Sequence, residues 1–159
     1  MENLNEKAMN EAIEESKENM RTNFVDGGPF GAVIVKNGEI IARGHNTVLK
    51  SKDPTAHAEV NTIRKACEIL GTYDLSDCIL FTSAEPCPMC LSAIIWANIK
   101  EVYFVNTKED AADIGFRDDC IYEYLKNKNE GVLKITCMEN EEAIKVFESF
   151  KNNEDKIIY

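Results

Sequence analysis

The sequence predicts one α/β domain over residues 1–159, a three-layer α/β/α arrangement with a mixed five-stranded sheet between two layers of helices. Strand-like apolar runs alternate along the chain with stretches of helical periodicity. A tight turn joins the first two strands, whereas a helix separates the last two, which allows a parallel crossover between them. With 159 residues and 44% hydrophobic residues, the chain is long enough to bury a core without disulfides.

The first half of the chain predicts a helix, a hairpin and a second helix. Apolar residues recur at helical spacing from residue 3 to about 22. The runs at 32–35 and 39–42 flank Asn37-Gly38, a pair typical of a two-residue hairpin turn. Asp53-Pro54 is expected to begin the second helix, because Asp is a common N-cap and Pro a common first helical residue; Gly71 is its expected end.

The second half alternates strands with helices. Strands are expected at 78–82, 101–105 and 132–136, and helices at 87–98, at 121–126 and around Ala143–Phe150, with a polar loop before residue 121.

Charge and composition exclude several classes of partner. The formal net charge is −10, and the sequence contains no cluster of Lys and Arg. A nucleic acid is therefore not an expected partner. No apolar run approaches the length of a membrane helix, and the acidic N-terminus does not resemble an export signal. The expected location is the cytoplasm, where the six cysteines would remain free thiols. Of these, Cys67, Cys78 and Cys137 are expected to be buried as small hydrophobic residues.

Two short motifs, His57-Ala-Glu59 and Pro86-Cys87-Pro-Met-Cys90, predict a zinc site. His57, Cys87 and Cys90 are three zinc ligands, and a catalytic zinc site has three protein ligands and one open position for water. Glu59 is then free to take a proton from that water and to deliver it to the substrate. This combination is the pattern of zinc-dependent nucleobase deaminases.

Other interpretations of these motifs remain open at this point. The Cys87–Cys90 pair alone could be a redox site, and a structural zinc site would need a fourth ligand, for which His45 or Cys120 are the candidates. His45 is expected to have a structural role rather than to bind metal. Asn46 could either form a turn or bind the edge of a nucleobase.

With these motifs and the segments 27–32 and 44–46, the chain resembles the cytidine deaminase-like superfamily, and more closely the small bacterial guanine deaminases. The resemblance implies a zinc-dependent hydrolysis of a free purine base, guanine, to xanthine and ammonia. It places a water activated by zinc at C2 of the ring, with Glu59 moving the proton to N3. It also implies a homodimer.

The same resemblance assigns further residues to the site. Asp118 matches a catalytic acid near the leaving amino group, although the neighbouring Asp119 matches almost as well. Asn46 and Ala58 are assigned to substrate binding, as are Phe30 and Trp96, either of which could instead be a core residue. Tyr159 matches a terminal aromatic residue that closes the partner subunit's site, so that the tail, residues 151–159, would be exchanged between subunits.

Three alternatives have to be separated from this prediction. A tRNA adenosine deaminase shares the zinc motifs but needs a basic surface for a folded RNA. Cytosine, cytidine or another amino-substituted heterocycle is chemically possible. The chain could also be a non-catalytic zinc module, which predicts a fourth protein ligand.

Overall fold

The computed structural model describes residues 3–159 and divides the chain into two compact units. The first unit extends to Tyr122, and the second comprises Glu123–Tyr159. None of the described helices is both long enough and apolar enough to span a bilayer.

A four-stranded mixed sheet forms the centre of the first unit. Its strands are β1 (Gly31–Lys36), β2 (Glu39–His45), β3 (Cys78–Ala84) and β4 (Glu101–Asn106), in the order β2-β1-β3-β4. β1 is antiparallel to both of its neighbours, and β3 is parallel to β4, so β4 is an edge strand. The hairpin prediction is confirmed: Asn37 and Gly38 both have positive φ angles, as a tight hairpin turn requires.

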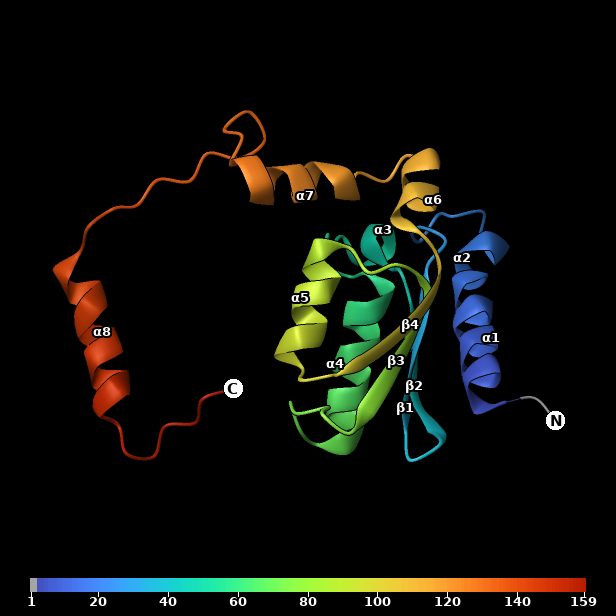
Figure 1. The fold of residues 1–159 in the computed structure, drawn as a ribbon, viewed down its shortest axis with the longest axis horizontal. Helices are drawn as coiled ribbons and strands as arrows, with labels where there is room; N and C mark the ends of the chain where they lie inside the picture. The colour runs from blue at the N-terminus through green and yellow to red at the C-terminus, as the bar shows by residue number, and fades with distance from the viewer. Residues whose placement is uncertain (1–2) are drawn as a thin grey trace. The chain divides into compact units, whose positions relative to one another are not determined.

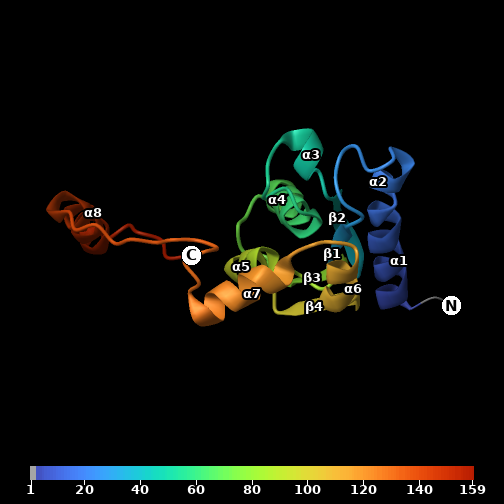
Figure 2. The same cartoon turned by 90° about the horizontal axis from the view of Figure 1, so that it is seen from above.

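Helices cover both faces of this sheet (Figures 1 and 2). α1 (Leu4–Ser16) lies on one face, and α4 (Ala58–Leu70) and α5 (Pro88–Trp96) lie on the other. Shorter helices lie near one end of the sheet: α2 (Glu18–Arg21), α3 (Val48–Ser51) and α6 (Lys108–Asp113). α7 (Asp118–Asn127) follows, and α8 (Glu141–Asn152) belongs to the second unit.

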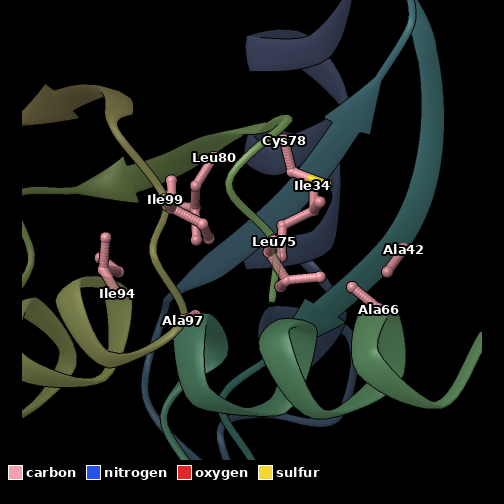
Figure 3. Packing of buried hydrophobic residues seen from close by; sticks show 9 residues of the cluster. All are labelled: Ile34, Ala42, Ala66, Leu75, Cys78, Leu80, Ile94, Ala97 and Ile99. Atoms are coloured by element: carbon pink, nitrogen blue, oxygen red, sulfur yellow. The ribbon is translucent and has the colours of Figure 1, made fainter. Parts of the chain in front are cut away.

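Each face of the sheet has its own apolar core. Figure 3 shows the larger one, in which Ile34 and Leu80 from the sheet pack with Leu75 and with residues of α4 and α5. On the other face, α1 packs Ala8 and Ala12 against Phe81. Burial of each larger side chain stabilises the folded state by about 1.5–3 kcal/mol. The two cores therefore hold the three layers together.

The predicted fifth strand is wrong for this chain. Residues 133–140 form no helix or strand, and Val132 and Ile135 are exposed. A strand needs a hydrogen-bonded neighbour, and the second unit contains no other strand among its described residues, so this segment has no ladder to join. The parallel pair is therefore β3–β4, with α5 as its crossover.

Other boundaries also differ from the prediction. The first helix is interrupted at Lys17, and the second begins at Ala58 rather than beside Asp53. Asp53 instead accepts hydrogen bonds from the backbone N–H and the hydroxyl of Thr55, which forms a turn ahead of the helix. Cys137 is exposed, because it lies in the irregular segment without a core around it, whereas Cys78 is buried.

Candidate active site

Two helix N-termini bring the predicted metal ligands together. His57 is the N-cap of α4, and Cys87 is the N-cap of α5, with Pro88 at its first position. Neither side chain caps its own helix, so both are available for another partner. Cys90 lies one turn along α5, on the side of Cys87.

The three ligand atoms lie at distances that suit zinc. His57 Nδ1 is 3.6 Å from Cys87 Sγ and 3.5 Å from Cys90 Sγ, and all three atoms lie within 4.8 Å of one another. A tetrahedral zinc with its usual bond lengths sets such atoms roughly 3.6 Å apart. The residues present therefore fit zinc, and among residues 3–159 neither His45 nor Cys120 joins them.

The electrostatics of the cluster favour a thiolate. Hydrogen bonds from Cys90 and His57 lower the pKa of Cys87 to about 4. The hydrogen bond to Cys87, together with burial, raises the pKa of Cys90, and the hydrogen bond to Cys87 also raises the pKa of His57. A thiolate is the form of cysteine that binds metal.

Glu59 lies beside the cluster, only 6% exposed, in the first turn of α4. Its Oε2 is 3.4 Å from Cys90 Sγ, and its Oε1 is 3.2 Å from the hydroxyl of Thr82, which is also 3.1 Å from the carbonyl oxygen of Ala84. Burial raises the pKa of Glu59. The Thr82 hydroxyl can donate to Glu59 when the carboxyl is ionised, and to Ala84 while accepting from Glu59 when it is protonated. The surroundings therefore accommodate both protonation states.

Two hollows with shared lining residues lie beside this cluster. The deep hollow, about 40 Å³, includes His57, Glu59, Cys87 and Asp118 in its wall. The wide hollow, about 620 Å³, is largely apolar; its walls include Phe24, Leu49, Pro54 and Ile114. Asn46, His57 and Phe116 line both hollows, so the two hollows adjoin at these three side chains.

Asn46 and Phe30 both line the deep hollow. Asn46 is 4% exposed, and its side-chain oxygen accepts from the backbone N–H groups of Gly28 and Val48, at 3.3 and 3.1 Å. Both of these hydrogen bonds end on the side-chain oxygen of Asn46, so its amide nitrogen is the group that remains for a ligand. Phe30 meets Phe116 edge to face, with ring centroids 4.8 Å apart. These groups provide a polar contact and an aromatic wall.

The remaining predicted residues differ in their placement. Asp118 is half-buried in the wall of the deep hollow, where burial and the Cys87 thiolate raise its pKa, whereas Asp119 is exposed. Ala58 is fully buried at the start of α4, where backbone N–H groups lack partners within the helix. Trp96 is 64% exposed and lines neither hollow, so the structure brings it neither to the site nor into the core. Tyr159 lies exposed in the second unit.

Three residues of the site were missed by sequence reasoning. In the sequence, Thr82 is only the last residue of a predicted strand, and Phe116 lies only within the polar loop before residue 121. Glu85 precedes the cysteine motif, lines the deep hollow and accepts a hydrogen bond of 3.0 Å from the backbone N–H of Lys108 at the start of α6. A polar residue at the end of a strand that leads into ligand residues is the signal that could have identified Thr82 and Glu85.

His45 has the structural role predicted for it. Its Nδ1 is 3.1 Å from a carboxylate oxygen of Glu15, so the imidazole joins β2 to α1. This contact leaves the metal cluster with three protein ligands among the described residues, as a catalytic zinc site requires.

Comparison with known proteins agrees with this geometry. Residues 2–106 match the family model of the cytidine and deoxycytidylate deaminase zinc-binding region. The chain belongs to this zinc deaminase family. It is therefore a hydrolase of carbon–nitrogen bonds in cyclic amidines, with one zinc per subunit held in a His-Cys-Cys cluster.

Within the family, the similarity is uneven. Guanine deaminase from Bacillus subtilis (strain 168) is 52% identical over 134 residues, which cover 84% of this chain and 86% of that protein. An X-ray structure of guanine deaminase from Bacillus subtilis superposes with a TM-score of 0.90 at 46% identity, covering 97% of this chain and 98% of that one. A tRNA-specific adenosine deaminase from Aquifex aeolicus is 50% identical, but over only 48% of this chain and 50% of its own length. The present chain thus has the cytidine deaminase-like fold.

Proposed function

We propose that this chain hydrolyses the free base guanine to xanthine and ammonia. The observation that carries the proposal is the extent of the similarity to the guanine deaminase structure, which covers 97% of the chain. That similarity therefore includes the segment after residue 106, which supplies Phe116 and Asp118 to the hollows. The tRNA-specific relative from Aquifex aeolicus matches about half of the chain.

The proposed chemistry is a hydrolytic exchange of an amino group for an oxygen. His57, Cys87 and Cys90 would hold zinc, which would act as a Lewis acid and lower the pKa of a bound water. Glu59 accepts a proton from the attacking water and delivers it to N3 of the ring, as C2 gains its C–O bond. A second proton then passes from the new C2 hydroxyl to the amino group through Glu59 or Asp118, so that ammonia leaves as the C2–N bond breaks and the C2=O bond of xanthine forms.

The other groups hold the ring in place. The amide nitrogen of Asn46 donates a hydrogen bond to the base, and the backbone N–H of Ala58 provides a second donor near the reacting carbon. Phe30 and Phe116 pack against the ring. A site built from paired polar groups rejects a base that lacks the matching partner by a large factor, because its buried groups are then left unpaired.

The partner of the site is proposed to be a second copy of the chain. β4 is an edge strand whose side chains Tyr103, Phe104 and Val105 remain exposed, and such an edge can accept another strand. Residues 132–136 have a strand-like sequence but no strand to pair with in their own unit. We propose that this segment pairs with β4 of the partner and that Tyr159 then closes the partner's wide hollow.

A cytoplasmic location is part of the same proposal. It rests on the chemistry of the site, because Cys87 and Cys90 bind zinc only as reduced thiolates, which a reducing compartment preserves.

The proposal is tested by measuring ammonia release from a panel of substrates. The zinc-loaded protein is incubated with guanine, adenine, cytosine, cytidine and an adenosine-containing tRNA anticodon stem, and xanthine is followed by its absorbance. Guanine is expected to have a kcat/KM at least about a hundredfold above the other substrates. Preferential deamination of the tRNA adenosine would replace the proposal with its nearest rival, and turnover of none of them would favour a non-catalytic zinc module.

A further inference from the structure

Asn19 is a buried polar residue outside the predicted site. Its side chain forms hydrogen bonds with two residues in the wall of the wide hollow. Asn19 lies in α2 and is 1% exposed. Its amide nitrogen donates to the carbonyl oxygen of Gly28 at 2.8 Å and to that of Asn46 at 2.7 Å. Both acceptor residues line the wide hollow.

These two bonds are part of a small hydrogen-bond network in the wall of the wide hollow. Asn46 accepts from the backbone N–H of Gly28, so Gly28 and Asn46 are joined directly as well as through Asn19. The space is tight, since a Cβ at Gly27 would lie 2.3 Å from the side-chain oxygen of Asn46. Asn19 therefore holds two stretches of chain together at the point where the side chain of Asn46 is oriented.

The backbone carbonyl of Asn19 also holds the loop at the edge of the wide hollow. Its own carbonyl oxygen accepts from the backbone N–H of Phe24 at 2.6 Å and from the hydroxyl of Thr22 at 3.2 Å. Asn23 and Phe24 both have positive φ angles, which are unusual for a side chain as bulky as that of Phe. Strained backbone of this kind persists only where its surroundings hold it, and it occurs often at ligand sites. Phe24 lines the wide hollow.

We infer that Asn19 is a positioning residue for substrate binding: it fixes Asn46 and the 22–28 loop so that the amide of Asn46 meets the purine edge. The inference rests on the proposed function, since it gives Asn46 a role toward the base. Asn19 does not touch the reacting atoms. Removal of the Asn19 side-chain amide should weaken binding of the base more than it slows the chemical step.

The test compares Asn19→Leu, which keeps the size but removes both donors, with Asn19→Ser, which is smaller and keeps one donor. Leu75→Val is the control, because it removes a methylene from the core without lining either hollow. We expect Asn19→Leu to raise KM for guanine about tenfold and Asn19→Ser about threefold, while kcat per folded, zinc-loaded molecule changes less than about twofold. Leu75→Val should lower the unfolding temperature but leave KM unchanged.

A double-mutant cycle separates positioning from a general loss of stability. If Asn19 acts through Asn46, the KM of the Asn19→Leu/Asn46→Ala variant should be close to that of Asn46→Ala alone. An unchanged KM in both Asn19 variants, or effects that multiply in the double variant, would overturn the inference. If Asn19→Leu does not fold, Asn19→Ser decides the outcome.

Failure of the proposed function would be visible separately, in the wild-type protein. If the wild type deaminates another base instead of guanine, the same KM comparison with that base still tests Asn19. If the wild type binds none of these bases, both the proposed function and the inference are overturned.

Discussion

Glu59 is a carboxyl group that lies almost entirely out of water, beside three metal ligands. Burial raises its pKa, which favours the protonated form, whereas the hydrogen bond from Thr82 stabilises the ionised form. A group that transfers protons has to exist in both forms during one turnover. At the scale of residues, the site is therefore defined as much by Thr82 as by the residues of the motifs.

Glu59→Gln is expected to separate zinc binding from proton transfer. The amide has nearly the size of the carboxyl, so His57, Cys87 and Cys90 should still bind one zinc, but Gln cannot accept the proton. We expect kcat to fall by about 10²–10⁴. Steady-state kinetics and metal analysis of the purified variant measure the two effects. Glu68→Gln, an exposed change on the same helix, is the control, and retained turnover in Glu59→Gln would end the general-base assignment.

Thr82→Val tests the hydroxyl that faces Glu59. The change keeps the shape and removes the donor, so the buried carboxylate loses one of its hydrogen bonds, a loss of about 1.5–3 kcal/mol for a bond to a charged group. We expect kcat to fall about tenfold or more with zinc content unchanged. Thr82→Ser, which keeps the hydroxyl, should recover most of the activity; if the Val and Ser variants are equally slow, the hydroxyl has no such role.

At the scale of elements, the site depends on where two helices begin. The spacing in His57-Ala-Glu59 and Cys87-Pro-Met-Cys90 was enough to predict the metal cluster and the position of Glu59, because such spacing survives small errors in the helix boundaries. The predicted start at Asp53 was wrong by several residues, since the side chain of Asp53 bonds Thr55 in a turn. That local competition between turn and helix is hard to judge from sequence.

Contacts between distant segments could not be predicted at all. Asn19 and Asn46 are brought together by α2 and the end of β2, and nothing in the local pattern of either segment indicates the other. The prediction of the fifth strand is wrong for a related reason: the residues at 132–136 favour a strand, but whether a neighbouring strand exists is a property of the folded assembly.

Gly31→Ala tests the packing of α1 on the sheet. An added Cβ would lie 2.3 Å from the carbonyl oxygen of Ala12 and from the backbone nitrogen of Ser16, and neither backbone atom can move without shifting the helix. We expect the free energy of unfolding to fall by about 2 kcal/mol or more, measured by urea denaturation. Gly131→Ala is the control, because its Cβ would meet chiefly the flexible end of Asn129. Equal effects in the two variants would refute the close approach of α1 to β1.

At the scale of the whole molecule, charge and exposed apolar surface point to different partners. A net charge of −10 disfavours binding to an RNA backbone, whichever base the zinc motifs could accept. In contrast, α8 leaves Ile144, Phe147 and Phe150 exposed at helical spacing, which is a large apolar face for a chain without a partner. A second copy of the chain has the same apolar face, so a two-fold dimer would bury this face on both copies.

Phe147→Glu is expected to disrupt the proposed dimer. The wild type should elute as a dimer at micromolar concentration, because covering the apolar faces is favourable, whereas a buried carboxylate in the interface would cost several kcal/mol. Light scattering coupled to size-exclusion chromatography measures the mass, and the guanine assay shows whether activity falls with it, as it should if Tyr159 of the partner subunit closes the site. Asn152→Asp, at an exposed position of the same helix, controls for the added negative charge. A wild type that remains monomeric at high concentration, with full activity, would exclude the exchange of tails.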